Sequence, residues 1–280
     1  MLSRGRTWIL LLPLAGVLTL FLFWPLTLVV RESLFSEGRF SLSNYTAMFV
    51  SKLYRESLTT SLALSVSTTL LGVLIGLPLS YGMHRSGPGM RNAIMTLASI
   101  PLTFSGLVVG FAFIVLLGTS GFVTLLLKKF FDVNPLEFSA FLFTWRGLVA
   151  AYCYFLIPRM ILTMTAAWST ADWSLLEAAR SLGAGPVRIL AQVLLPMIGP
   201  AVLAGSSLLF AVSMGAFGTA FSLTGIGVKI LPLVIYTHVS ELSTEIAKAD
   251  ALAVLLTVIT TLIILGYERC FVRRPPSSQG

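Results

Sequence analysis

Charged residues are scarce in this chain of 280 residues. Asp, Glu, Lys and Arg make up 11% of it and hydrophobic residues 56%, whereas about a quarter of a soluble domain is charged. Soluble proteins hide apolar side chains behind a charged surface, and so few charges cannot form one here. The shortage excludes water as the main solvent and predicts an integral membrane protein whose remaining surface is covered by the lipid bilayer.

Cysteine and histidine are also rare, with two residues of each kind. Cys153 lies inside an apolar run and Cys270 at the end of another, so they offer neither a metal-ligand spacing nor a plausible disulfide. Neither His84 nor His238 has a metal-ligand or nucleophile pattern beside it. The sequence therefore predicts no metal site and no catalytic residues, which disfavours an intramembrane enzyme.

Acidic residues are fewer than basic ones, and the net charge is +8. The basic residues stand singly or in pairs at the ends of apolar runs, without the aromatic-interleaved stripe of a nucleic-acid surface, so we expect no nucleic-acid partner. If the N-terminus is cytoplasmic, the basic residues are densest in the short inside segments next to the span ends, as the positive-inside rule requires. This pattern favours cytoplasmic N- and C-termini over the opposite topology.

Long apolar runs are what the sequence has in abundance. A helix needs about 20 apolar residues to cross a bilayer. Runs of that length cover residues 8–30, 58–82, 93–118, 144–167, 193–215 and 250–268. The first run follows Arg4 and Arg6 as a secretory signal would, but no small-residue cleavage site comes after it, so we interpret it as an uncleaved span. The predicted fold is an all-α membrane bundle of about six transmembrane helices.

Three longer loops then face outward, over about residues 31–57, 119–143 and 216–249. Each is too long for a tight connection and polar enough to be partly ordered. In the first loop, the spacing of Tyr45 and Phe49 suits either a short interfacial helix or an irregular loop.

Two pairs of glycines are spaced four residues apart within the predicted spans. They are Gly72 with Gly76 and Gly106 with Gly110. Small residues at this spacing let two helix backbones approach closely. The pairs serve either packing inside the chain or dimerisation, and the motif itself does not decide between them.

The most polar inside segment covers residues 168–188, WSTADWSLLEAARSLGAGPVR. Asp172 and Ser174 are good helix starters, and Ser174 and Glu177 have the spacing of a capping box. Gly183 suits the left-handed position after a helix, and Pro186 suits the start of a second helix. One face of the first helix collects the apolar residues Leu175, Leu176, Ala179 and Leu182.

The segment therefore predicts a helix–turn–helix that stands out of the membrane on the cytoplasmic side. Such a polar helix, with the small Ala178 and Ala179 and the charged Arg180, is shaped to fit a groove on a soluble partner. The alternative is an amphipathic helix that lies on the lipid surface and needs no partner.

At this point the sequence resembles a known family. Glu177-Ala178-Ala179, three residues, Gly183, nine residues, Val193, one residue and Leu195-Pro196 are similar to the EAA loop of binding-protein-dependent ABC importer permeases. The family pattern has Ile where this chain has Val193. The resemblance covers roughly residues 57–266. It implies the type I ABC importer permease fold, with a coupling helix that docks into an ATPase subunit.

The resemblance also implies the partners and the roles of residues. The coupling residues would be Glu177, Ala178, Ala179, Arg180, Gly183 and Pro196. The partners would be ABC ATPase subunits, a second permease chain of the same or a homologous kind, and an extracytoplasmic solute-binding protein, assembled at a bacterial inner membrane and working by alternating access. No G-x-x-x-x-G-K-[ST] pattern occurs in the chain. It would thus hold no cofactor, and ATP and Mg would be bound by the partner subunit.

The expected organisation has three parts. Residues 1–56 would form the first transmembrane helix and an outer loop, residues 57–268 the core permease domain, and residues 269–280 a cytoplasmic tail.

Carboxylates are almost missing from the predicted spans, and Arg159 is the one charge expected near mid-membrane. Arg159 either lines the translocation path and binds an anion, or is structural, bonded to carbonyls freed by Pro158 or to the partner chain. Two further stretches, Phe23-Trp24-Pro25-Leu26 in the first span and Ile230-Leu231-Pro232-Leu233-Val234-Ile235-Tyr236 outside, resemble the permeases of spermidine/putrescine, 2-aminoethylphosphonate and ferric-iron importers. This resemblance implies a small polar solute. An ion-coupled secondary transporter is the other class, but Asp250 at the edge of the sixth span is its one candidate carboxylate.

Overall fold

The computed structural model describes residues 12–36, 39–225, 227–240 and 245–272. The predicted Arg4 and Arg6 and most of the predicted tail lie outside these residues. A helical stretch from residue 12 leads into the first labelled element. The helices are η1 (Thr19–Phe23), α2 (Trp24–Ser33), α3 (Ser43–Val50), α4 (Lys52–Arg85), α5 (Pro88–Thr103), α6 (Gly106–Leu117), α7 (Phe122–Phe131), α8 (Pro135–Ala140), η2 (Phe141–Phe143), α9 (Trp145–Thr170), α10 (Ser174–Ser181), α11 (Pro186–Ile189), η3 (Leu190–Leu194), α12 (Leu195–Gly215), α13 (Gly218–Thr224), α14 (Leu231–Val239) and α15 (Ile246–Val272).

The all-helical prediction is confirmed, with one small addition. The strands β1 (Phe35–Ser36) and β2 (Arg39–Phe40) pair antiparallel in the first outer loop. The same loop contains α3, so the helical interpretation of the Tyr45 and Phe49 spacing is the right one. The described parts of the other two outer loops contain α7 and α8 and, near the sixth span, α13 and α14, as the predicted partial order requires.

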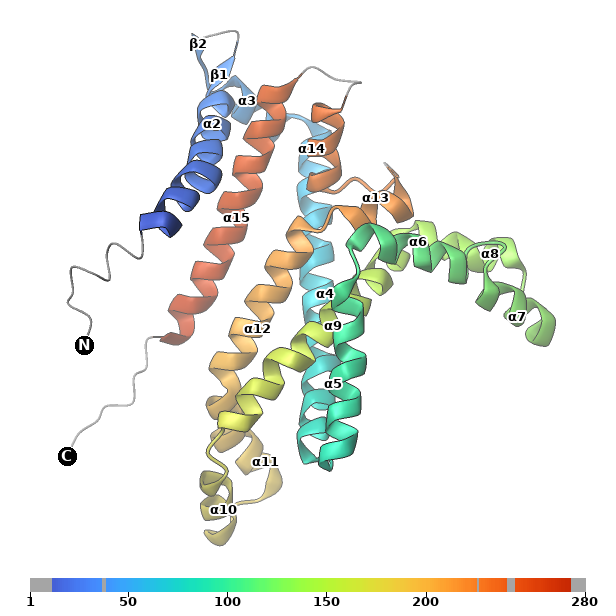
Figure 1. Ribbon diagram of the computed structural model, residues 1–280, viewed down its shortest axis with the longest axis vertical. Coiled ribbons are helices and arrows are strands. Elements are labelled where there is room, and N and C mark those ends of the chain that lie inside the picture. The colour runs from blue at the N-terminus through green and yellow to red at the C-terminus, as the bar shows by residue number, and fades with distance from the viewer. Residues whose placement is uncertain (1–11, 37–38, 226, 241–244, 273–280) are drawn as a thin grey trace.

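Six described helical stretches are long and apolar enough to cross a membrane. They are Leu12–Ser33, Lys52–Arg85, Gly106–Phe131, Trp145–Thr170, Pro186–Gly215 and Ile246–Tyr267. The second and fifth enclose the predicted runs, the fourth begins one residue after the start of its run, the sixth covers most of its run, and the first overlaps its run from residue 12 on. In Figure 1, α4, α5, α9, α12 and α15 lie along or oblique to the long axis of the molecule.

The predicted third span, residues 93–118, was wrong as one continuous helix. The backbone turns extended at Phe104 and Ser105, where α5 ends and α6 begins. Ser105 caps the new helix, because its hydroxyl accepts a hydrogen bond from the Val108 amide at 3.5 Å. Figure 1 shows α5 beside the bundle, whereas α6 and α7 leave it sideways and α8 returns next to them. Hydropathy alone could not locate this turn, because the residues on both sides of it are apolar.

The core is built around α9, which packs against α4 and α12. Tyr152, Met160 and Trp168 of α9 are fully or almost fully buried. The Gly72/Gly76 pair lies in this contact: a Cβ on Gly72 would stand 2.5 Å from Leu209, and one on Gly76 would stand 2.8 Å from Met160.

The second glycine pair, Gly106 and Gly110, is in equally close contact with α13, where an added Cβ would meet Thr219 and Ser222. Both pairs therefore face helices of their own chain. The packing interpretation is confirmed for them, and the dimerisation interpretation is not.

Two π-helical segments interrupt the apolar helices among the described residues, and one residue separates each of them from a proline. η1 comes before Pro25, and η3 comes before Pro196. Proline has no N–H to give to the carbonyl four residues earlier, and beside each proline the helix widens, so that the amide just before the proline bonds five residues back. The bonds from the Trp24 amide to Thr19 O and from the Leu195 amide to Leu190 O show this pattern. Pro196 thus shapes the entry into α12 rather than the turn of the hairpin.

Candidate functional site

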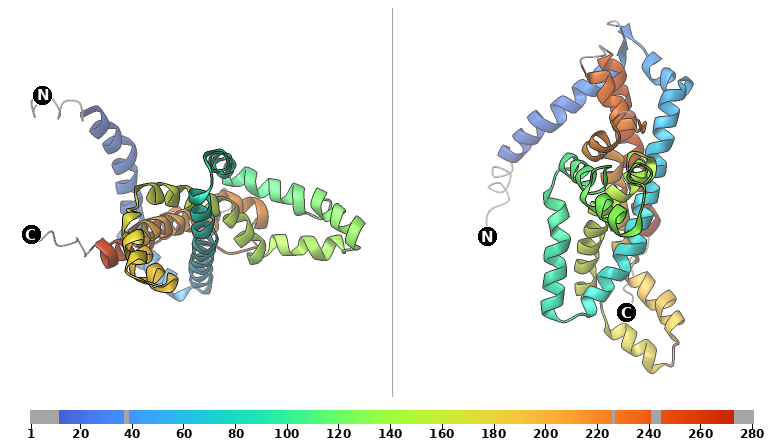
Figure 2. Two further views of the ribbon diagram at one scale, coloured as in Figure 1. Left: turned by 90° about the horizontal axis from the view of Figure 1, so that it is seen from below. Right: turned by 90° about the vertical axis from the view of Figure 1, so that its right-hand side faces the viewer.

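The polar segment forms a hairpin of α10 and α11 that projects beyond the lower end of the helical bundle (Figures 1 and 2). The predicted capping box was wrong in its details. Ser174 is the first helical residue, and the carboxylate of Asp172 accepts bonds from the Ser174 amide at 3.1 Å and the Ser174 hydroxyl at 2.6 Å. Asp172 therefore fixes the start of the helix, and the side chain of Glu177 remains exposed.

The end of α10 is a Schellman turn. Gly183 has φ +77°, its amide donates to Arg180 O at 2.9 Å, and the Ala184 amide donates to Ala179 O at 3.0 Å. These two bonds satisfy carbonyls that the end of a helix would otherwise leave unpaired. The left-handed position predicted for Gly183 is confirmed, and Pro186 opens α11 as expected.

The hairpin presents a mixed surface to its surroundings. Glu177, Ala178 and Arg180 are exposed and Ala179 is half-buried. The predicted apolar face is divided, because Leu176 is 7% exposed whereas Leu182 is 88% exposed. Charged and apolar side chains that lie together on a protruding helix suit a protein partner better than water alone.

An aromatic cluster, Tyr81, His84, Trp168 and Trp173, holds the root of the hairpin. The ring of Trp173 stacks on His84 with centroids 5.0 Å apart, and its indole N–H donates to Trp168 O at 3.2 Å. Trp168 in turn donates to the hydroxyl of Ser80 on α4 at 3.0 Å and packs against Tyr81. The cluster joins the hairpin to α4 and α9.

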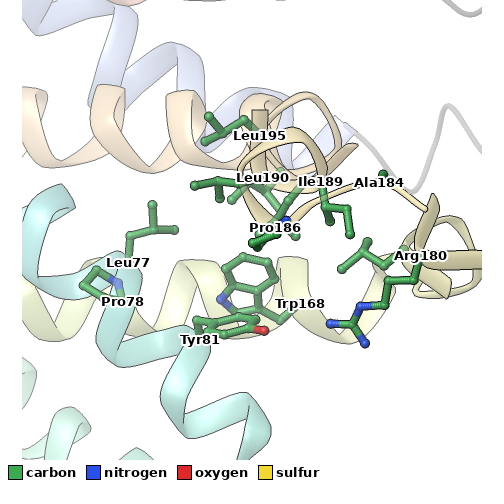
Figure 3. A pocket seen from close by; sticks show the side chains of 13 residues that line it. Leu77, Pro78, Tyr81, Trp168, Arg180, Ala184, Pro186, Ile189, Leu190 and Leu195 are labelled. Atoms are coloured by element: carbon green, nitrogen blue, oxygen red, sulfur yellow. The ribbon is translucent and has the colours of Figure 1, made fainter. Parts of the chain in front are cut away.

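This cluster was not recognised from the sequence, although two of the five tryptophans stand within six residues of each other at the start of the polar segment. A cavity of about 550 Å³ opens beside it. Figure 3 shows Trp168 and Tyr81 on one side of this cavity, Leu190 and Pro186 on the other and Arg180 at its edge.

Arg159 lies far from the hairpin, near the middle of α9. It is half-buried and lines a second cavity, of about 330 Å³. Among the described residues, its guanidinium has no hydrogen-bond or ion-pair partner, and the carbonyls near Pro158 do not bind it. The structural interpretation that rested on those carbonyls therefore has no support, whereas anion binding and pairing with a second chain both remain.

At the opposite end of the molecule, a polar cluster joins α4, α14 and α15. The Tyr54 hydroxyl lies 3.0 Å from His238 Nε2, and Glu245 lies 3.4 Å from His238 Nδ1 and 2.6 Å from Lys248 Nζ. Burial lowers the pKa of His238, against a smaller upward effect of Glu245. The hydrogen bond from Lys248 lowers the pKa of Glu245. Asp250 follows Lys248 by two residues on α15 and lies near Glu32 of α2.

Together, six candidate spans and a projecting polar hairpin define a multi-pass membrane protein. Comparison with known proteins identifies its kind. Residues 69–271 match the model of the binding-protein-dependent transport system inner membrane component family, and the chain belongs to this family. It is therefore the permease subunit of a binding-protein-dependent ABC importer, a multi-pass component of the inner membrane. Such a permease has no ATPase activity of its own, and ATP binding lies in the partner ATPase subunit.

The relatives of this chain are named for the transport of different solutes. The chain is 30% identical to a putative 2-aminoethylphosphonate transport system permease of Salmonella typhimurium, over 94% of this chain and 90% of the relative. It is 31% identical to a spermidine/putrescine permease of Haemophilus influenzae, over 82% and 79% of the two chains. It is 31% identical to a molybdenum permease of Mycobacterium tuberculosis, over 74% and 77%.

The fold is that of a solved transporter. A chain of a bacterial ABC transporter for the acidic polysaccharide alginate superposes with a TM-score of 0.76 and 18% identity, covering 96% of both chains. A second crystal structure of the alginate transporter contains the periplasmic protein with bound oligosaccharide. The predicted class of fold is confirmed by this likeness.

Proposed function

We propose that the α10 hairpin is the coupling helix of the importer and that it docks into a groove of the partner ATPase. The observation that carries this proposal is the rigid, exposed hairpin itself, capped at Asp172 and Gly183 and anchored to α4 and α9 by its aromatic root. Glu177, Ala178, Ala179 and Arg180 contribute the docking surface, and Gly183 fixes the turn. Pro196 acts at a distance, through the widened helix that leads from the hairpin into α12.

The proposed assembly contains two permease chains, two ATPase subunits and an extracytoplasmic solute-binding protein. ATP binding closes the ATPase pair, the two hairpins move with it, and the permeases open toward the loaded binding protein; hydrolysis resets the cycle. In this arrangement the hairpin end of the molecule is cytoplasmic, as are both termini, and the end with α3 and α14 faces outward. Residues 57–268 form the core permease domain, with the first helix and outer loop before it and the tail after it.

The solute is a small polar molecule. The relatives are named for an aminoethylphosphonate, for polyamines and for molybdenum, so a polyamine, an organophosphonate or a similar compound fits the family. Membership of the ABC importer family argues against the alternative hypothesis of an ion-coupled secondary transporter. Asp250, on which that alternative depended, lies within the first turns of α15 rather than in mid-span.

The test is purification of the chain from membranes of the native cell, with identification of the co-purifying ATPase and an activity assay. Ala178→Asp places a charge on the docking surface and should reduce bound ATPase and stimulated activity at least about tenfold, because a buried unpaired charge costs several kcal/mol. Gly89→Asp is the matched control, since Gly89 stands in open space at the start of α5, on the same end of the molecule. Equal losses in the two variants, or no ATPase with the wild type, would overturn the proposal.

A further inference from the structure

The cavity beside Arg159 lies at the junctions of α5 with α6 and of α12 with α13. The chain is extended between α5 and α6 at Phe104 and Ser105, and it leaves the helix again between α12 and α13 at Ala216. The two junctions are tied together, because the hydroxyl of Thr219 donates to Gly106 O at 2.9 Å. Residues from both junctions line the cavity of about 330 Å³. Non-helical backbone at membrane depth is tolerated where it lines a polar cavity, and transport proteins use such sites to bind solutes.

The charges around this cavity have one sign. Arg159 lines it, and none of the lining residues is acidic. The other charged residues of the described spans lie within about a turn of a span end, so none of them neutralises Arg159 at mid-span. An unpaired guanidinium inside a bilayer is expensive, which makes it a functional residue by default.

The backbone adds to the positive potential. Gly106 is the first residue of α6 and lines the cavity, and the first amides of a helix have no acceptor within it. The end of α12 lies at the same cavity, and there Ala216 O accepts a hydrogen bond from the buried Tyr152 hydroxyl. A guanidinium and a helix start that meet at one cavity are suited to a small anion.

We propose that this cavity binds an anionic group of the transported solute and that Arg159 is its ligand. The proposal rests on the proposed permease function and narrows its solute class: the importer carries a compound with an oxyanion, such as a phosphonate, phosphate or carboxylate. A compound that carries positive charge alone is excluded, since nothing in the cavity compensates it.

The test measures the electrostatic preference of the cavity without knowledge of the solute. Leu102, which lines the cavity and is half-buried, is replaced by Cys in a Cys153→Ser, Cys270→Ser background, and the full chain is placed in phosphatidylcholine nanodiscs. The rate of modification by an anionic methanethiosulfonate, divided by the rate for a cationic one, reports the local potential. Val50→Cys, at the exposed end of α3, gives the ratio outside the cavity.

We expect the ratio at Leu102→Cys to exceed that at Val50→Cys about tenfold, because a charged cleft concentrates counter-ions by this factor or more. Arg159→Met should abolish the difference, Arg159→Lys should keep most of it, and methylphosphonate should slow the reaction while putrescine does not. An unchanged ratio in Arg159→Met overturns the proposal, as does protection by putrescine. Arg159 would then be a structural residue, paired with the second permease.

A co-purification of Arg159→Met with the ATPase separates the two proposals. If the ATPase remains bound and the ratio shows no effect of Arg159, the anion site fails and the coupling function stands. If no ATPase binds even to the wild-type chain, the coupling function fails whatever the ratio.

Discussion

Two parts of the molecule project from the bundle, and they differ in chemistry. The hairpin of α10 and α11 extends from its lower end, and the transverse arm, made of α6, α7 and α8, extends sideways (Figures 1 and 2). The hairpin exposes Glu177 and Arg180 among its apolar residues. The arm exposes mostly large apolar side chains: Phe111, Val115, Leu116, Phe122, Leu125, Phe130, Phe131 and Leu136.

The difference shows how each projection must be covered. Because the hairpin exposes charged side chains, it can stand in water before a soluble partner binds. An arm with so many exposed apolar side chains is not stable in water, and it needs lipid or another membrane chain. The same argument explains why the hairpin has caps and an aromatic root of its own, whereas the arm begins at a turn that is held by contact with α13.

The largest effect should separate the two projections directly. Leu125→Asp places a charge on the arm and should destabilise the protein by about 3 kcal/mol, the cost of a carboxylate in apolar surroundings. Leu182→Asp makes the same change on the hairpin, where the side chain is 88% exposed, and should alter stability by less than about 0.5 kcal/mol. Denaturant unfolding of the two purified variants in the same detergent measures this. Similar losses would mean that the arm lies in water.

A smaller effect concerns the turn of the hairpin. The space around Gly183 is open, so any cost of a side chain there comes from its φ of +77°. Gly183→Ala should therefore weaken the turn by about 1 kcal/mol, and Gly183→Asp should impair solute-stimulated ATPase activity more than membrane expression. Gly185→Ala is the matched control, because Gly185 also stands in open space but has φ −70°. Loss of expression and activity together in Gly183→Asp would instead indicate misfolding.

The smallest effect is expected from acidification, and it concerns the polar cluster at the outer end. The fold lowers the pKa of His238 from 6.5, so below that pH the unfolded state binds a proton that the folded state does not, and stability falls. The lowered pKa of Glu245 acts in the same direction at lower pH, since its stabilising charge is lost as pH falls from 4.5 downward. The protection of α14 against hydrogen exchange, corrected for the intrinsic pH dependence of amide exchange, should therefore fall between pH 7 and 5, whereas the protection of α7, which contains no histidine, should remain constant. An equal loss of protection in α7 would contradict this assignment of the titrating groups.

The hairpin could be predicted from the sequence because the residues that determine it lie within the hairpin itself. Gly183 and Pro186 act on the backbone within a few residues, and the EAA spacing marks the same stretch. The capping residue was wrong because Asp172 and Ser174 are equally good starters, and their own hydrogen bond decides between them. The turn at Ser105 was missed because its partner, Thr219, is remote in sequence. The aromatic root and the cavity beside Arg159 could not be predicted either, because residues from several helices form each of them.

Site-specific photo-crosslinking tests the central claim most directly. Benzoylphenylalanine is placed at position 178 on the hairpin or at position 125 on the arm, and the complex is irradiated in native membranes. We predict that the probe at position 178 crosslinks to a subunit with a Walker A motif, and that the probe at position 125 crosslinks to lipid or to a second permease. The account is contradicted if position 178 reacts with lipid alone while position 125 captures the ATPase.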